Sequence, residues 1–203
     1  MKTIQLNNKA ITPSKIVCIG RNYVEHIKEL DNETPSEPVI FCKPNSAISD
    51  EINLDENDEI HYEGEICFVV MNNQLAGVGF GLDLTKREVQ SKLKTKGLPW
   101  ERAKAFDGSA VLSDFVEFDG NTQDIHMRLL IDGELKQYGG YDLMLYKPQQ
   151  ILEEISRFMT LEDGDVIMTG TPKGVGKIQR NTQFTGRIFQ GETLLVENNC
   201  PVK

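Results

Sequence analysis

The stretch HYEGEICFVV, residues 61–70, places two acidic side chains directly before an apolar run of the β-strand type. Because side chains alternate faces along a strand, we expect His61, Glu63 and Glu65 on one face and the apolar side chains on the other. Neighbouring carboxylates beside an apolar run cost free energy unless a cation or solvent meets them. The stretch therefore indicates either oxygen ligands for a hard divalent cation or a solvated face of a sheet.

Strand signals recur on both sides of this stretch. Other short apolar runs, bounded by turn or charged residues, are Lys15–Ile19, Pro38–Cys42, Ile125–Ile131 and Gly186–Val196. Asp132-Gly133 predicts a hairpin turn, and Asn72-Asn73 lies between two further strand-like segments. Many strands with few helices predict a β-rich α+β fold, and the chain length fits a single domain spanning residues 1–203.

Three short helices are expected. Thr85 to Glu88 has the capping-box pattern of a helix start, and Gly97 fits the end of that helix. Another helix should begin near Pro148 and run to about Met159, and a third should cover residues 23–30. The inner stripe predicted for the second of these helices is Ile151, Leu152, Ile155, Phe158 and Met159.

Composition excludes several classes of protein. The net charge of −9 argues against binding nucleic acid or anionic membranes, which needs a basic surface. No apolar run approaches the ~20 residues that span a bilayer, and residues 1–5 lack a signal peptide's apolar segment, so a cytoplasmic location is expected.

The acidic stretch 50–59 is expected to be a solvated loop. Without CxxC spacing, the cysteines are expected as buried reduced thiols: Cys18, Cys42, Cys67 and Cys200.

Three more segments carry candidate chemistry. Asp83 follows a Gly-rich apolar strand just before a helix start, so it is either a third metal ligand or an acid that complements the helix dipole. His26 and Glu29 lie one helical turn apart, which suits either a general-base pair or an incidental surface contact. The Gly-rich segment 170–177 fails the P-loop pattern, but its backbone N–H groups are able to meet an anionic group.

The order of these motifs resembles one protein superfamily over residues 15 to 197. The ordered set is Gly20-Arg21-Asn22-Tyr23, His26 with Glu29, Pro38, Lys43-Pro44, Glu63-x-Glu65, Asp83-x-Thr85, Gly97-Leu98-Pro99-Trp100, Ala103-Lys104, Gly164-Asp165 and Gly170-Thr171-Pro172-x-Gly174-Val175-Gly176. It resembles the fumarylacetoacetate hydrolase superfamily, and most closely the small acylpyruvase and oxaloacetate decarboxylase branch. The resemblance implies a mixed β-sandwich roll of the C-terminal-domain type with a few short helices, usually a homodimer.

The resemblance also implies roles for particular residues. Mg²⁺ or Mn²⁺ would be held by Glu63, Glu65 and Asp83. His26 and Glu29 match an acid–base dyad on a short lid helix. Lys104 matches a lysine that contacts the substrate near the metal, and other positions around the ligand match Arg21, Lys43, Arg87, Gln90 and Thr171.

The implied activity is metal-dependent cleavage of a small 2-oxo acid through a chelated enolate, by acylpyruvate hydrolysis or oxaloacetate decarboxylation. An isomerase, tautomerase or hydratase acting on a 2-oxo (di)acid, such as oxaloacetate or an intermediate of aromatic catabolism, is the alternative. A binding protein without turnover would need the carboxylates but not a dyad of His26 and Glu29, so the residues favour an enzyme.

Overall fold

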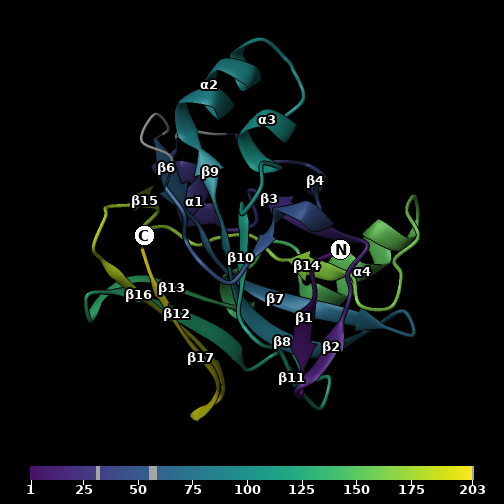
Figure 1. Cartoon of the computed structure of the whole chain (residues 1–203). Coiled ribbons are helices and arrows are strands. Elements are labelled where there is room, and N and C mark those ends of the chain that lie inside the picture. Colours follow the sequence, from purple (N-terminus) through teal and green to yellow (C-terminus); the bar gives the residue numbers. More distant parts are fainter. Residues whose placement is uncertain (31–32, 55–58, 203) are drawn as a thin grey trace.

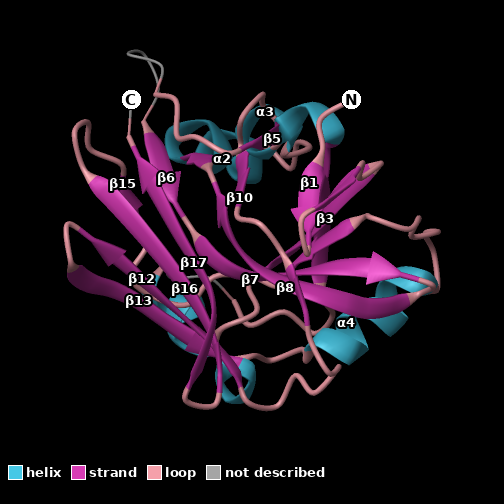
Figure 2. Cartoon of the chain, turned by 60° about the horizontal axis from the view of Figure 1, so that its bottom comes forward, coloured by secondary structure: helices cyan, strands magenta, loops and turns pink. Residues whose placement is uncertain are grey.

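The computed structural model describes residues 1–30, 33–54 and 59–202. A curled, mixed sheet of eight strands forms its centre (Figures 1 and 2). Two neighbour pairs, β3 with β14 and β10 with β5, are parallel and the others are antiparallel. In spatial order the strands are β4 (Val39–Pro44), β3 (Lys15–Gly20), β14 (Val166–Met168), β7 (Gly64–Met71), β8 (Gln74–Asp83), β10 (Ala110–Leu112) and β5 (Ile48–Ser49), with β11 (Val116–Glu117) also paired to β8.

A second, four-stranded antiparallel sheet packs on one face of the central sheet (Figure 2). Its order is β13 (Glu134–Gly140), β12 (Ile125–Ile131), β16 (Gln183–Gln190) and β17 (Thr193–Pro201). Phe68 and Phe80 of the central sheet belong to one apolar cluster with Met127 and Phe184 of the second. The sheets approach so closely that a Cβ at Gly186 would overlap the Phe80 ring, which explains a glycine inside β16.

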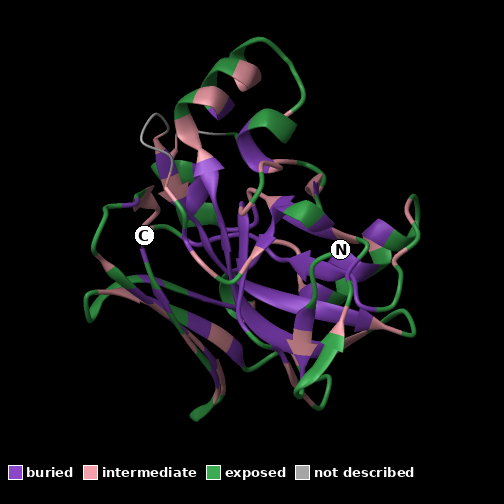
Figure 3. Cartoon of the chain, viewed as in Figure 1, coloured by how far each residue is buried: buried purple, intermediate pink, exposed green. Residues whose placement is uncertain are grey.

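The central sheet is buried on both faces, as the purple strands of Figure 3 show. Behind β3 and β14, helix α4 (Pro148–Ser156) packs Ile151, Leu152 and Ile155 against the sheet. The opposite face buries a separate apolar cluster that includes residues of β1 (Ile4–Leu6). Strand β1 pairs with β2 (Lys9–Ile11), and the remaining small sheet is β15 (Gly176–Lys177), β6 (Ile60–Tyr62) and β9 (Thr85–Lys86). The β-rich α+β class and the mixed sandwich expected from the sequence are confirmed.

The hairpin turn predicted at Asp132-Gly133 is present, and Asn72-Asn73 does lie between two strands. Asn72 and Asn73 connect β7 to β8, and Asp132 and Gly133 connect β12 to β13. All four residues have positive φ values, between 51° and 82°. Such turns match the right-handed twist of the strands and favour Asn, Asp and Gly.

The helices lie where the sequence predicts them, with two corrections. Helix α1 is Val24–Glu29 and α2 is Arg87–Thr95. The predicted capping box is wrong: Thr85 is in β9, α2 starts two residues later, and no side chain caps it. Phe158 is 60% exposed, because α4 ends at Ser156 before the predicted stripe is complete. Gly97, at φ +61°, follows the end of α2 as predicted.

One helix and two short 3₁₀ turns were not anticipated. They are α3 (Glu101–Lys104), η1 (Asn45–Ala47) and η2 (Tyr141–Leu143). Helices α2 and α3 lie together at one end of the molecule (Figure 1).

The remaining sequence expectations have mixed outcomes. None of the four cysteines forms a disulfide, as expected; three are buried and Cys42 is half-buried. Of the acidic stretch predicted to be a solvated loop, residues 55–58 lie outside the described residues. Within the described ranges, none of the helices is long and apolar enough to cross a membrane.

Candidate active site

Three carboxylates meet where β7 begins and β8 ends. Glu63 lies between β6 and β7, Glu65 lies in β7, and Asp83 is the last residue of β8. The antiparallel pairing of β7 with β8 brings them together, and Asp83 N–H donates to the Glu63 carbonyl at 2.9 Å. One ligand atom from each carboxylate lies within 4.8 Å of the others. All three are nearly inaccessible, with 1–6% exposure, so the solvated-face interpretation is wrong.

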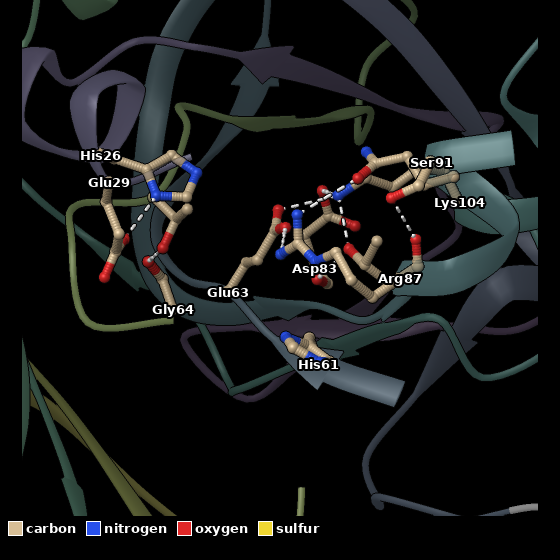
Figure 4. A network of polar contacts seen from close by, with 12 residues as sticks. His26, Glu29, His61, Glu63, Gly64, Asp83, Arg87, Ser91 and Lys104 are labelled. Carbon is tan, nitrogen blue, oxygen red and sulfur yellow. Dashed lines mark hydrogen bonds and ion pairs between the residues drawn. The ribbon is translucent and has the colours of Figure 1, made fainter. Parts of the chain in front are cut away.

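Buried cations face these carboxylates. Lys104 Nζ lies 2.8 Å from Glu63 Oε2, 2.7 Å from Asp83 Oδ2 and 2.6 Å from Thr85 Oγ1. Arg87 donates to the other oxygen of Glu63 at 2.8 Å. Figure 4 shows Glu63 between His26 on one side and Arg87 and Lys104 on the other, with dashed lines from Glu63 to Arg87 and Lys104.

Lys43 supports this arrangement from behind. Its Nζ lies 2.8 Å from Asp83 Oδ1, donates to Ser109 Oγ at 3.1 Å and also contacts the Lys104 carbonyl. The ammonium therefore joins β4 to the segment that carries Lys104 and contributes positive charge beside the carboxylates. Because the side chain is fully buried, it acts on the site through these contacts.

The pKa values of Glu63 and Glu65 are shifted in opposite directions. Burial alone would raise the pKa of Glu63, but the charges of Lys104, Arg87 and His26 outweigh it and hold the pKa at about 2. Burial raises the pKa of Glu65 well above its ordinary value, and the negative charges of Asp83 and Glu63 raise it further. Among the described residues, the Gly170 N–H donates to Glu65 Oε2 at 2.7 Å. Glu65 is thus the carboxylate whose charge is least compensated by protein groups.

The donor set fits a hard divalent cation. Asp83 Oδ1 is buried and, within the described part of the chain, has no hydrogen-bond partner, since Lys43 approaches it outside hydrogen-bonding geometry. A carboxylate oxygen that accepts no hydrogen bond, beside an undercompensated Glu65, leaves capacity for a metal ligand. Three carboxylates suit Mg²⁺ or Mn²⁺, which prefer oxygen ligands.

His26 lies across the pocket from Arg87 and Lys104 (Figure 4). It belongs to α1, and its Nδ1 lies 3.0 Å from Glu29 Oε2. The second Glu29 oxygen accepts the Gly174 N–H at 3.0 Å, so the Gly-rich segment does meet an anionic group, one supplied by the chain itself. If Nδ1 carries the proton donated to Glu29, the Nε2 atom is left as the base. The buried ring lines the same pocket as the carboxylates.

The structure gathers the residues singled out in the sequence around one pocket. Those that line it are Arg21, His26, Glu63, Glu65, Asp83, Arg87, Gln90, Lys104 and Thr171. Glu29 and Lys43 lie behind this lining, bonded to His26 and beside Asp83 respectively.

His61 is not part of the site. The strand pattern put it on the face of Glu63 and Glu65, but the strand breaks at Glu63, and His61 belongs to β6 in the small three-stranded sheet. Its ring contacts Glu59 at 3.1 Å, and Figure 4 shows it apart from the carboxylates.

Sequence reasoning missed several residues that shape the site. Gln137 of β13 accepts the Gly64 N–H at 2.9 Å and donates to Thr171 Oγ1 and the Pro172 carbonyl. It therefore ties the backbone between the two glutamates to the Gly-rich segment. Lys94 also lines the pocket and was not singled out. No local sequence signal marks either residue. Gln137 reaches the site from a distant strand, and Lys94 is one of several lysines in and beside α2.

The chain matches the family model described as fumarylacetoacetate (FAA) hydrolase C-terminal over residues 15–197. With this fold and this carboxylate pocket, it belongs to the fumarylacetoacetate hydrolase family. It is 40% identical over 200 residues to the oxaloacetate tautomerase YcgM of Escherichia coli K12, covering 89% of this chain and 90% of the relative. It is 37% identical to a mitochondrial oxaloacetate decarboxylase of Dictyostelium discoideum, covering 83% and 85%.

A solved structure extends the comparison to a bound metal. Fumarylpyruvate hydrolase from Pseudomonas aeruginosa, in complex with Mn²⁺ and pyruvate, superposes with a TM-score of 0.88 at 28% identity. The match covers 99% of this chain and 95% of that one.

Proposed function

We propose that this chain is a divalent-metal-dependent enzyme that interconverts the keto and enol forms of oxaloacetate or a closely related 2-oxo diacid. The observation that carries the proposal is the dyad of His26 and Glu29, in which the buried His26 ring faces three carboxylates across a single pocket and Glu29 holds the ring from the outer side. A binding protein needs the carboxylates but has no use for the dyad. The similarity to an oxaloacetate tautomerase supports the choice of substrate.

The metal would be held by Glu63, Glu65 and Asp83, whose geometry and spare ligand capacity suit it. When bound, Mg²⁺ or Mn²⁺ would act as a Lewis acid that stabilises negative charge developing on the C2 oxygen of the substrate. Lys104 already pairs with two of these carboxylates, and its pKa is raised because the charges of Asp83 and Glu63 outweigh the cost of burial. It therefore stays charged at neutral pH and adds a fixed positive charge beside the reacting group.

The protein's own residues supply the proton transfer. Glu29 accepts from His26 Nδ1 and leaves Nε2 free to take a proton from C3 of the keto acid. Water protonates the C2 oxygen to complete the enol, and the imidazolium passes its proton to the hydroxide that is left. In the opposite direction, the imidazolium returns this proton to C3 while the enol hydroxyl loses its proton to water. Glu29 is itself held by the Gly174 N–H, so the ring orientation is set before substrate binds. Arg87 and Gln90, which contact each other at 3.2 Å, line the pocket beside the carboxylates and would bind the C1 carboxylate.

A direct assay follows the loss of enol absorbance of freshly dissolved oxaloacetate, with Mg²⁺, Mn²⁺ and EDTA as separate conditions. The uncatalysed rate in buffer with metal is subtracted. His26→Asn should lower the metal-dependent rate by about 10²–10⁴-fold, the usual contribution of a positioned base. His61→Asn is the matched control, because this second histidine lies outside the pocket. Full activity of His26→Asn would rule out the dyad as the proton-transfer group.

Carbon–carbon cleavage is the second candidate. The similarity to an oxaloacetate decarboxylase and to a fumarylpyruvate hydrolase favours it. A coupled pyruvate-release assay with oxaloacetate and acetylpyruvate separates the reactions. Pyruvate release as fast as enol loss would make cleavage the main activity, and enol loss without pyruvate release would leave tautomerisation.

A further inference from the structure

Lys94 lines the wall of the pocket. It is in the last turn of α2, and its Nζ lies 5.1 Å from the centre of the Trp100 ring. Trp100 in turn packs against Phe41, with ring centres 5.8 Å apart, and all three side chains line the pocket of the three carboxylates. The aromatic face holds the ammonium in place without neutralising it.

The pocket carries positive charge that the protein does not pair. Lys104, Lys43 and Arg87 already pair with Glu63 and Asp83. Within the described ranges, neither Lys94 nor Arg21 has a carboxylate within ion-pair distance, and Arg21 Nε is buried without a hydrogen-bond partner. Bringing such groups together costs free energy unless an anion joins them.

The titration of Lys94 agrees with this geometry. Burial lowers its pKa to about 8, and the positive charges of Arg21 and Arg87 contribute to the same shift. An anion placed beside this ammonium would relieve both effects, so the site is suited to bind one. A divalent ion held by the carboxylates would add further positive charge, which makes a ligand with two negative groups the better match.

We propose that Lys94, held against Trp100, binds the second carboxylate of a dicarboxylic 2-oxo acid and so selects diacids over 2-oxo monoacids. This rests on the proposed function, in which the first carboxylate and the 2-oxo group face the three acidic residues. A neutral acyl group at the same place would leave the half-buried ammonium without an anionic partner. Lys94 is therefore a specificity-determining residue, and the proton transfer remains with His26.

The single tryptophan of the chain makes this testable by binding alone. Because Trp100 is that residue and touches Lys94, its fluorescence should report a ligand in the subsite. Oxaloacetate and 2-oxobutanoate are four-carbon 2-oxo acids that differ in a terminal carboxylate or methyl group. Both are titrated in the presence of Mg²⁺ by stopped-flow fluorescence, which reads binding before turnover.

The variants are Lys94→Met, Lys94→Arg and a matched control, Lys92→Met, whose lysine is exposed on the same helix. The wild type should bind oxaloacetate at least 10-fold more tightly than 2-oxobutanoate. Lys94→Met should weaken oxaloacetate binding by about 10- to 100-fold, the range for losing a hydrogen bond to a charged group, and leave 2-oxobutanoate unchanged. Lys94→Arg should restore part of the preference, and Lys92→Met should retain all of it.

An unchanged preference in Lys94→Met, or no preference in the wild type, would overturn the subsite. The enol assay on the same preparations keeps this outcome separate from the proposed function. An active wild type whose preference does not depend on Lys94 overturns only the subsite. An inactive wild type with a Lys94-dependent preference overturns only the tautomerase.

Discussion

Replacing Lys104 by methionine should make the fold depend on a divalent cation. The Lys104 ammonium contacts Glu63 and Asp83 at 2.7–2.8 Å, and its side chain is 3% exposed. Methionine has a similar volume but no charge, so both carboxylates would lose a fully buried partner. Breaking a buried ion pair from one side costs about 3–5 kcal/mol. For a chain of this size each kcal/mol corresponds to about 2–4 °C, so the metal-free melting temperature should fall by roughly 6–20 °C.

The metal should recover much of this loss. A ligand that binds only the folded state at 100 times its dissociation constant adds about 2.7 kcal/mol. The variant has lost the ammonium that competes for the same oxygens, so its melting temperature should rise more with Mn²⁺ than that of the wild type. Differential scanning fluorimetry in EDTA and in Mn²⁺ measures both shifts. Lys96→Met, which removes an exposed lysine beyond α2, is the control and should change neither.

The pH dependence of this effect has a definite sign. A lysine with a raised pKa stabilises the fold below its unfolded pKa, and this stabilisation is lost only as pH rises through the folded value. Glu63, whose pKa is lowered to about 2, stabilises the fold above its unfolded value of about 4.3, and this is lost as pH falls toward 2. The difference in metal-free melting temperature between the wild type and Lys104→Met should therefore be constant from about pH 6 to 9 and become smaller below about pH 4. A metal-free melting temperature within 2 °C of the wild type would refute the reasoning.

Three further predictions concern the support of the site, the fold and the metal. Gln137→Leu should lower the free energy of unfolding by about 2–4 kcal/mol, because it leaves buried backbone groups without partners; a change below 0.5 kcal/mol in urea unfolding would contradict this. Burial opposes ionisation of Asp165, but hydrogen bonds from Lys15 and neighbouring donors lower its pKa, so its stabilisation is present above about pH 4 and lost as pH falls below that. Asp165→Asn should therefore cost about 1–3 kcal/mol at pH 7 and less at pH 3, and an equal cost at both would count against it. Glu63→Gln with Glu65→Gln should abolish Mg²⁺ binding in calorimetry, and unchanged affinity would exclude this metal site.

Much of the fold follows from local sequence. The apolar run of residues 66–70, the Asn72-Asn73 and Asp132-Gly133 turns, and the glycine after α2 depend on the φ/ψ preferences and side-chain character of neighbouring residues. These signals do not need the rest of the chain. The prediction that Thr85 caps a helix was wrong. Thr85 lies in β9, where it pairs with β6, and its hydroxyl accepts a hydrogen bond from Lys104; both partners are distant in sequence, so a local pattern does not include them.

The sequence by itself predicted the family and the acidic residues and histidine that line one pocket, through the order and spacing of its motifs. Only the tertiary structure decided what surrounds them. The register of β7 against β8 brings Asp83 to Glu63, and Gln137 reaches Gly64 from a hairpin more than 70 residues later. Which carboxylates are paired with cations, and that Lys94 has no carboxylate beside it among the described residues, depends on distances between groups far apart in the chain. Such contacts follow from long-range packing, which the periodicity of single segments does not encode.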